Sequence, residues 1–363
     1  MIFVFRYHLV ALFGLFLSTT LISQSDLSSA VSIADRLCNE TFKNEQFPGM
    51  AVMVWKEGEI VFSKGYGFAN VEDKIAVDPY KSKFRVGSIS KPYTATALGI
   101  LYDRNKIFLD FPIQFYVPDF PQKKYEITLR QLTGHLAGIR HYRGAEFMSM
   151  RHYPTVVEGL EIFKNDPLLH EPNTKYAYSS YGWNLVSAAI EGASGEGFLD
   201  FMNREVFEAL EMKNSGPDIA NQEINGRVSF YMKNSEGEVH LAPFVDNSYK
   251  WAGGGFLSTA EDVVTFAKAH LQNTLLLPST TSLWTKGQMT SDGKNTKYGI
   301  GWRSDEDGKG RRWIGHSGGS VGGTSMMLIY PEEEIIVVTL VNLSSARMGN
   351  LAFRVANQFL SIM

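Results

Sequence analysis

The stretch "VGSISKPYTATALG", residues Val86 to Gly99, places two serines, a lysine and a proline within five positions, 88–92. Residues three apart on an α-helix lie on the same face, so Ser88 and Lys91 share a face and Ser90 does not. A hydroxyl beside an amine can form an activated nucleophile. A serine three residues before a lysine is nevertheless common, and alone it more often marks a helix start beside a solvated charge.

Two further stretches give this tetrad more weight. "TKYAYSSYGWNLVSAAIE", residues 174–191, sets Tyr178, Ser179 and Ser180 directly before a helical pattern. "RRWIGHSGGSVGGTSMMLIY", residues 311–330, begins with polar and small residues and continues as an apolar strand pattern. Its candidate site residues, ahead of the strand or within it, are His316, Ser317, Gly318 and Gly319.

With these motifs the sequence resembles the serine β-lactamase and penicillin-binding-protein-like hydrolases, in particular their class C-related branch. The signatures of that family are Ser-x-x-Lys, Tyr-x-Asn and Lys-Thr-Gly or His-x-Gly, in that order. They stand here, in the same order, as Ser88–Lys91, Tyr178–Ser180 and His316–Gly318. The resemblance implies catalytic roles for Ser88, Lys91 and Tyr178.

Within the family, the stretches 134–142 and 244–267 resemble most the serine β-lactamase-like proteins of vertebrate mitochondria. The similarity runs from about residue 30 to the C-terminus. That branch is proteolytic and assembles into filaments, which implies peptide substrates and the option of a homo-oligomer for this chain. The stretch "WAGGGFLST", residues 251–259, predicts a tight loop with a buried tryptophan, and its lining the cleft is an alternative that the resemblance adds, because the family counterpart packs near the site.

The chemistry of the three candidate catalytic residues leaves the identity of the base open. A serine hydroxyl needs a base within hydrogen-bond reach. Lys91 can accept its proton if burial lowers the pKa of the amine. Tyr178 is the alternative base, because a nearby ammonium favours its phenolate and would let it relay protons to the leaving group.

The β-strand motif is expected to bind substrate. By analogy with the family, the oxyanion hole would consist of the backbone N–H groups of Ser88 and Gly319. Small residues at Gly318 and Gly319 let a substrate approach the backbone closely.

Two positions depart from the family pattern. His316 stands in place of lysine and would hold a substrate carboxylate less firmly, while Ser180 in place of asparagine removes an amide contact. Both departures argue against efficient penicillin hydrolysis. We therefore expect a serine hydrolase that acts on peptides or amides, with an esterase or a D-amino-acid-specific cell-wall peptidase as the alternative. The contrasting hypothesis is a non-catalytic scaffold of the same fold.

Composition limits the partners. The 363 residues carry a net charge of −3 without a basic block, which argues against nucleic acid as a partner. The single cysteine, Cys38, excludes an internal disulfide and is interpreted as a core residue. His135, His141 and His152 lack a metal-site spacing and are interpreted as structural or surface residues. No metal and no cofactor are expected, and the expected partner is a small peptide, amide or ester substrate.

The N-terminus has the pattern of a secretory signal peptide. Arg6 and His8 precede the apolar run 9–17, and small polar residues follow. We predict a signal peptide over residues 1–24 and an extracytoplasmic location, periplasmic or secreted. Membrane contact is expected only if this leader is not cleaved.

Alternating and helical patterns predict the fold class. A helix over residues 28–44 is followed by two strands that turn at Glu57–Gly58, and two apolar runs near the C-terminus are split at 331–333 before a helix over 346–362. We predict an α/β fold of the α+β type: one antiparallel sheet built from both chain ends and flanked by helices, as in β-lactamases and transpeptidases. The predicted hydrolase domain spans 28–363, with its sheet part in 28–87 and 290–363 and a mostly helical part in 88–270.

Overall fold

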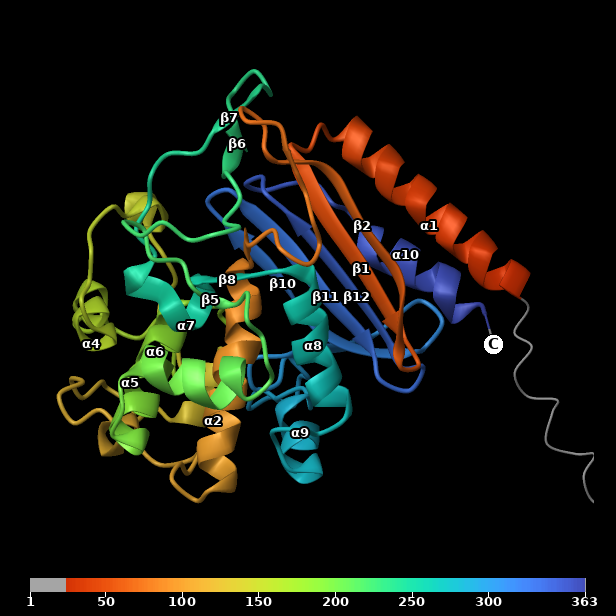
Figure 1. The fold of residues 1–363 in the computed structure, drawn as a ribbon. Coiled ribbons are helices and arrows are strands. Elements are labelled where there is room, and N and C mark those ends of the chain that lie inside the picture. Colours follow the sequence, from red (N-terminus) through yellow and green to blue (C-terminus); the bar gives the residue numbers. More distant parts are fainter. Residues whose placement is uncertain (1–23, 363) are drawn as a thin grey trace, which may run out of the picture.

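The computed structural model describes residues 24–362 of the chain (Figure 1). Residues 1–23 of the expected signal peptide lie outside the described residues, so the structure does not test that expectation. Over residues 24–362, none of the helices combines the length and the apolar character that a membrane span requires.

The strands from the two chain ends form one antiparallel sheet, as predicted. Its seven strands run in the order β3-β2-β1-β12-β11-β10-β9. Their bounds are β1 Gly49–Lys56, β2 Glu59–Asn70, β3 Ile75–Ala76, β9 Arg303–Glu306, β10 Arg312–Ser320, β11 Gly323–Tyr330 and β12 Ile335–Val341. The N-terminal and C-terminal strands meet where β1 pairs with β12, with Met53 opposite Val338.

The central strands β1 and β12 of the sheet are buried on both faces. In β1 the side chains of Ala51 and Met53 enter the core that faces the helical region, while those of Met50 and Val52 enter a second core on the other side. Successive strand residues point to opposite faces, so a strand that is covered on both sides is apolar throughout. This explains why β1 and β12 are continuous apolar runs and do not alternate between apolar and polar residues.

Helices α1 Gln24–Asn44 and α10 Leu351–Leu360 cover the outer face of the sheet, and Figure 1 shows them side by side there. Cys38 is fully buried in the core beneath them, as expected for a core residue. Helix α10 begins five residues later than predicted, because Gly349 has a φ of +54° and Ala346 donates its N–H to Thr324 Oγ1 at 2.9 Å. Residues 346–350 therefore form a turn.

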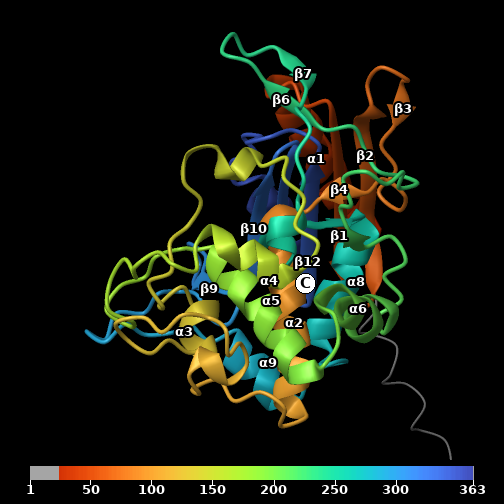
Figure 2. The same ribbon diagram turned by 90° about the vertical axis from the view of Figure 1, so that its left-hand side faces the viewer.

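The mostly helical region covers the inner face of the sheet (Figures 1 and 2). Its helices are α2 Ser90–Asp103, α3 Leu129–Thr133, α4 Val156–Gly159, α5 Tyr181–Ser194, α6 Phe198–Met202, α7 Trp251–Gly254, α8 Ala260–Leu271 and α9 Pro278–Trp284. Residues 90–101 of α2 are all buried, which makes α2 the central helix of this region. A helix that is enclosed on all sides positions its first turn rigidly.

Two small sheets in this region were not predicted. They consist of β4 Phe84–Arg85, β8 Phe256–Ser258 and β5 Gly216–Pro217 in one sheet, and of β6 Tyr231–Lys233 and β7 Val239–Leu241 in the other. Strands of two or three residues are too short to show a period in the sequence. The β4–β8 pairing matters for the site, because it joins the chain just before Ser88 to the chain just after α7.

Candidate active site

Ser88 lies in a 3₁₀ turn, Gly87–Ile89, that leads directly into α2. Gly87 has a φ of +52°, in the left-handed region, and a Cβ at this position would lie 2.6 Å from the backbone nitrogen of Gly319. Only glycine satisfies both conditions at low cost. The turn is therefore pressed against β10, and it presents a half-buried Ser88 at the start of the central helix.

Lys91, one turn after Ser88, is fully buried and makes three contacts. Its Nζ lies 3.0 Å from Ser88 Oγ, 3.2 Å from Ser180 Oγ and 2.6 Å from the carbonyl oxygen of Gly253. Burial, aided by the positive charge of Lys250, lowers the pKa of Lys91 well below its usual value. The neutral form of the amine is therefore favoured. It offers two N–H donors and one acceptor lone pair to the three oxygen atoms that surround it.

Tyr178 approaches the same serine from the segment before α5. Its hydroxyl donates a hydrogen bond to Ser88 Oγ at 2.9 Å, and Lys91 Nζ lies 4.8 Å from the centre of its ring. Burial raises the pKa of Tyr178 well above its usual value. The expectation that an ammonium would favour the phenolate is wrong in direction, because Lys91 is itself desolvated and the neutral phenol is favoured.

The structure separates the neighbouring serines by role. Ser180 Oγ contacts Lys91, which places it in the site. Ser90 Oγ instead donates to the carbonyl oxygen of Gly87 at 2.7 Å and accepts the N–H of Phe256 at 3.3 Å. Ser90 therefore stabilises the turn that holds Ser88 and does not face the nucleophile.

The β10 motif lies across from these residues, with alternate residues facing different ways. Ser317 and Gly319 are exposed, whereas His316 and Gly318 are buried. A Cβ on Gly318 would lie 2.0 Å from the carbonyl oxygen of Val86, while a Cβ on Gly319 would meet nothing within 4 Å. Gly318 thus allows β10 to touch the Ser88 turn, and Gly319 leaves open space beside it.

His316 does not fulfil the expectation of a partly charged carboxylate ligand. Its Nε2 lies 2.8 Å from the hydroxyl of Tyr298, and its Nδ1 lies 2.6 Å from the carbonyl oxygen of Ser317. Burial lowers the pKa of His316 well below its usual value. The ring is neutral, with both nitrogens engaged inside the protein, so it cannot supply the positive charge that a lysine would supply.

Two histidines that the sequence reasoning assigned to structural or surface roles lie next to Tyr178. The ring centre of His135 is 4.2 Å from that of Tyr178, and the ring centre of His141 is 5.6 Å from it. Their stretch, residues 134–142, was among those that carried the family resemblance, and this was the available signal. His152 is exposed and contacts Asp246 at 2.9 Å, in agreement with a surface role.

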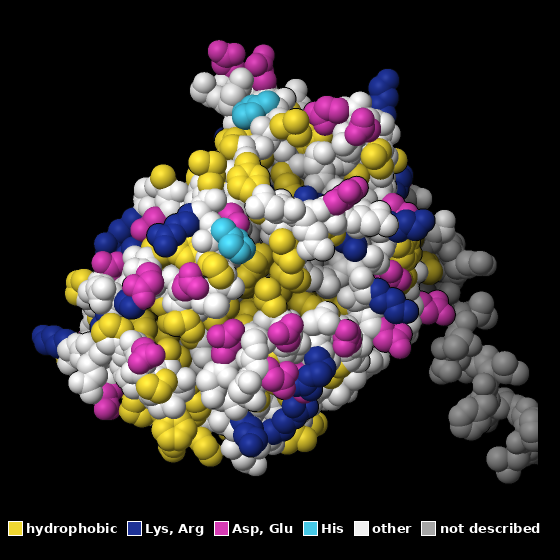
Figure 3. Space-filling model, turned by 60° about the vertical axis from the view of Figure 1, so that its left-hand side comes forward, with side chains coloured by type: hydrophobic (Ala, Val, Ile, Leu, Met, Phe, Trp, Pro, Cys, Tyr) yellow, Lys and Arg dark blue, Asp and Glu magenta, His cyan; other side chains and the backbone are white. Residues whose placement is uncertain are grey.

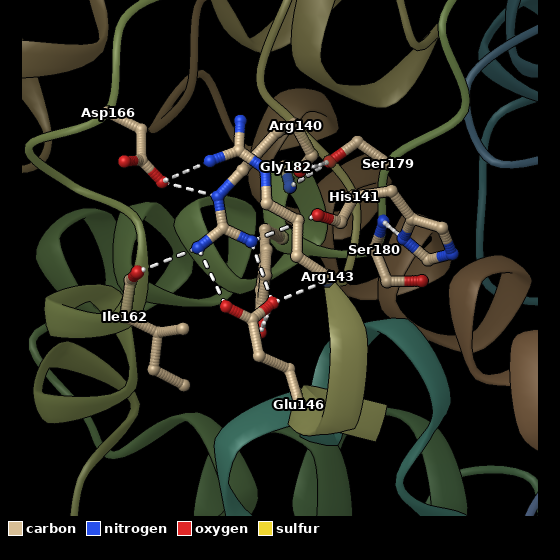
Figure 4. A network of polar contacts seen from close by, with 10 residues as sticks. Arg140, His141, Arg143, Glu146, Ile162, Asp166, Ser179, Ser180 and Gly182 are labelled. Carbon is tan, nitrogen blue, oxygen red and sulfur yellow. Dashed lines mark hydrogen bonds and ion pairs between the residues drawn. The ribbon is translucent and has the colours of Figure 1, made fainter. Parts of the chain in front are cut away.

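Figure 4 shows how the segment that carries His141 is fixed. Arg140 donates two hydrogen bonds to the carboxylate of Glu146, at 2.7 and 2.9 Å, a third to Ile162 O at 3.0 Å, and another to Asp166. The backbone carbonyl of Arg140 accepts the hydroxyl of Ser179 at 2.6 Å. The guanidinium therefore ties the 140–146 segment to residues 162–166, and the carbonyl of Arg140 ties it to Ser179, before α5.

Two further cations near the site were missed. Lys250 is fully buried, with its Nζ 4.4 Å from the ring centre of Phe147, and burial lowers its pKa to about 7. Arg303, in β9 opposite Gly315 of β10, is exposed and close enough to influence the pKa of Tyr178. Within residues 24–362 Arg303 forms no ion pair. Both positions lack any local motif, so only the fold could reveal them.

In the part of the chain that the structure describes, His, Cys, Asp and Glu side chains form no group of three or more that could hold a metal ion. The polar side chains that surround Ser88 are instead hydroxyls, an amine and neutral imidazoles.

Comparison with known proteins places these motifs in context. Residues 34–359 match the family described as Beta-lactamase. The human "Serine beta-lactamase-like protein LACTB, mitochondrial" is 31% identical over 420 aligned positions, which cover 86% of this chain and 76% of that protein.

Solved structures share the fold at lower identity. The octameric penicillin-binding protein homologue from Pyrococcus abyssi superposes with a TM-score of 0.77 at 24% identity, covering 87% of this chain and 74% of that one. The D-stereospecific amidohydrolase from Streptomyces sp. gives 0.71 at 22% identity, covering 91% and 97%. The predicted fold class is confirmed.

Proposed function

Because the chain belongs to the Beta-lactamase family of serine hydrolases, we propose that it forms an acyl-enzyme on Ser88 with peptide-like or amide substrates. The proposal extends the family assignment to a particular nucleophile and a substrate class. It rests on the contacts of Ser88 and on the charges that border the cleft.

The observation that carries the proposal is the environment of Lys91. A neutral amine has two N–H donors and one lone pair. The carbonyl oxygen of Gly253 can only accept, and Ser180 Oγ can accept a second N–H; in this arrangement the lone pair faces Ser88 Oγ at 3.0 Å and can take its hydroxyl proton. Lys91 is thus oriented as the base, and Tyr178, a neutral phenol, is suited to donate a proton.

The proposed reaction then balances without any added group. Ser88 Oγ bonds to the acyl carbon as its proton passes to Lys91 Nζ, and the negative charge moves to the carbonyl oxygen. The backbone N–H groups of Ser88 and Gly319 would stabilise that oxygen. The carbonyl then re-forms as the C–N bond breaks, and the leaving amine takes the proton of Tyr178, which is replaced from Lys91. Water later releases the acyl group by the reverse route.

The borders of the cleft support a substrate that carries a carboxylate near the scissile bond. Arg303 is an exposed cation without an ion-pair partner within residues 24–362, and Ser317 is exposed on the neighbouring strand. An unpaired guanidinium beside an active site favours a planar anion. The face that carries α4, α5 and α7 also presents apolar side chains across its middle, with charged side chains around them (Figure 3), which suits a peptide with apolar residues.

A second candidate is hydrolysis of esters or of D-amino-acid-containing cell-wall peptides. The neutral His316 favours this alternative over penicillin hydrolysis, since it gives no charge to a β-lactam carboxylate. One neighbour in fold is named as a D-stereospecific amidohydrolase. The scaffold hypothesis is less well supported, because a scaffold has no need for a desolvated lysine within 3.0 Å of a serine hydroxyl.

The test is intact-protein and peptide mass spectrometry after treatment with a fluorophosphonate and, separately, with a penicillin. We expect one adduct on Ser88, no adduct with Ser88→Ala, and an adduct still on Ser88 with Ser90→Ala. An unchanged mass in the wild-type protein would overturn the acyl-enzyme and support the scaffold. A labelled protein that hydrolyses p-nitrophenyl esters but no member of a peptide library would identify an esterase.

The extracytoplasmic location remains part of the proposal and is supported by the leader pattern alone. Cell fractionation with N-terminal sequencing of the mature chain tests it, and an intact N-terminus on a cytoplasmic or mitochondrial protein would contradict it. A homo-oligomer is an option because one neighbour in fold is octameric, and light scattering of the purified protein decides it.

A further inference from the structure

His135 and His141 are placed around Tyr178 in a way that the proposed reaction does not yet explain. They come from the segment after α3, while Tyr178 comes from the segment before α5. Figure 4 shows His141 with its ring directed at the backbone of Ser180. The two segments are distant in sequence and are joined by backbone hydrogen bonds, from Ala177 N–H to His135 O and from Asn173 N–H to Leu136 O, both at 2.9 Å, and by side-chain contacts.

The side-chain contacts are two hydrogen bonds. Two consecutive backbone N–H groups each donate to an imidazole nitrogen. Ser179 donates its N–H to Nδ1 of His135, and Ser180 donates its N–H to Nδ1 of His141, both at 3.1 Å. A backbone N–H can only donate, so each ring accepts at Nδ1 and carries its proton on Nε2. These two bonds fix the backbone directly after Tyr178.

The same rings also pack against the phenol. The ring of His135 lies 4.2 Å from that of Tyr178 and is tilted by 41°, and the ring of His141 meets it edge-on at 5.6 Å and 88°. Each histidine therefore holds the backbone directly after Tyr178 and packs against the Tyr178 side chain. A shift of either ring would move the Tyr178 hydroxyl away from its 2.9 Å contact.

The protonation states agree with this geometry. Burial lowers the pKa of His135 well below its usual value and that of His141 to about 4. Both rings are neutral near neutral pH and remain acceptors. In a protonated ring Nδ1 would carry a hydrogen and could not accept the backbone N–H that faces it.

Histidine at position 135 also destabilises the folded protein. This argues that it is not present only to satisfy the local backbone conformation. Its φ is +60°, in the left-handed region, and its buried Nε2 has no hydrogen-bond partner among the described residues. Each feature lowers the stability of the folded protein. Asparagine or glycine would relieve the backbone at once, so the imidazole itself must contribute something that they do not.

We propose that His135 and His141 are positioning residues that act through Tyr178: as a pair of hydrogen-bond acceptors and ring contacts they hold its hydroxyl on Ser88. The inference rests on the proposed acyl-enzyme function and assigns these two residues a part in it. Neither histidine touches the reacting atoms.

The experiment compares matched variants at each position in the rate of hydrolysis of an anilide, the substrate whose leaving amine takes the proton of Tyr178. His141→Asn keeps an acceptor near the place of Nδ1, whereas His141→Phe keeps the ring and loses the acceptor. We expect His141→Asn to stay within about threefold of wild type and His141→Phe to lose about tenfold or more, below the full contribution of a positioned acid or base. At position 135, where the left-handed backbone restricts the choice, His135→Asn and His135→Gly form the corresponding pair.

A double-mutant cycle with Tyr178→Phe separates positioning from a general structural effect. Residues that act through one group are not additive, so His141→Phe should cost little more once the Tyr178 hydroxyl is gone. Thermal melting identifies folded variants, and the cycle is read on those. An equal loss from His141→Phe in both backgrounds, or equal rates for the asparagine and phenylalanine variants, overturns the inference. Absence of any fluorophosphonate label on the wild-type protein would overturn the proposed function itself, which is a distinct outcome.

Discussion

The two sides of the cleft around Ser88 differ in what they offer. The helical side, from α2, α5 and α7, brings an amine, a phenol and a hydroxyl within 3.3 Å of one another or of the nucleophile. The β10 side brings mainly backbone: its histidine is turned inward, and its exposed positions are a serine and a glycine. The first side is built to move protons and the second to admit a substrate.

The two sides also differ in the kind of residue that each one requires. The chemistry of the helical side depends on particular side chains and on their desolvation. That of the β10 side depends on the absence of side chains, because Gly87 and Gly318 allow two backbones to touch. Substitutions on the helical side should therefore remove rate without much loss of stability, and substitutions on the β10 side should disturb structure first.

The largest effect is expected from Lys91→Met, which removes the amine and keeps an apolar chain of similar length. We predict a loss of about 10²–10⁴-fold in the rate of Ser88 acylation, as for a positioned general base. Stability should not fall, because a desolvated amine is replaced by an apolar group. Stopped-flow labelling with a fluorophosphonate measures the rate, and Lys286→Met, on an exposed lysine, is the control. A labelling rate equal to wild type would show that another group is the base.

Tyr178→Phe should be the next most severe change. It removes the hydroxyl and keeps the ring contact with His135, so the melting temperature should stay near that of wild type. We predict that turnover falls about 10²-fold or more on an anilide and less on the matched p-nitrophenyl ester, because only the amine leaving group needs a proton. Equal losses on the two substrates would contradict the role of proton donor.

The glycines of β10 test the other side of the comparison. In Gly318→Ala the new methyl group would lie 2.0 Å from the carbonyl oxygen of Val86, so β10 must move away from the Ser88 turn. We expect a loss of about 1–3 kcal/mol in the free energy of unfolding, as for overpacking, together with a loss of activity. Gly319→Ala meets no atom within 4 Å and should leave stability unchanged while raising KM. Urea unfolding and steady-state kinetics measure both, and equal stability of the two variants would contradict this picture of β10.

Lys250→Met should give the smallest effect on activity at neutral pH and a gain in stability. The folded-state pKa of about 7 is below the unfolded value, so the unfolded chain binds the extra proton and stability rises with pH through the window from about 7 to 10.5. Below pH 7 the charged, buried amine lowers the free energy of unfolding by a few kcal/mol, and the variant removes this loss. We expect a higher melting temperature at pH 6 that converges with that of wild type near pH 10.

The same variant should change the pH dependence of acylation. The positive charge of Lys250 is one of the causes that lower the pKa of Lys91. Without it Lys91 holds its proton to higher pH, and the acid limb of the acylation rate should move upward in pH. An unchanged pH profile would show that Lys250 does not act on the base, and Lys286→Met is again the control.

Much of the fold could be predicted, because its signals are local. The apolar runs on either side of Glu57–Gly58 and of residues 331–334 are strands, and they pair as expected. The short strands β4, β5 and β8 could not be predicted, since pairs of two or three residues are selected by tertiary contacts.

The motifs of the site could be predicted from the sequence. The residues that hold the catalytic side chains in place could not. The helical spacing that puts Ser88 under Lys91 is local, and the structure brings the two atoms to 3.0 Å. The acceptor for Lys91 at Gly253 comes from far along the chain, and so do the rings that hold Tyr178. No spacing along the sequence reports these contacts.

The sequence by itself determined the order of the three motifs, the face that Ser88 shares with Lys91 and the apolar strands of both chain ends. All of these follow from backbone periodicity, which is a property of neighbouring residues. Only the tertiary structure decided the direction of the pKa shifts: the pKa values of Lys91 and His316 are lowered and that of Tyr178 is raised, which favours the neutral form of each group. The physical reason is that desolvation and the field of other charges depend on residues distant in sequence, which the fold alone brings around each group.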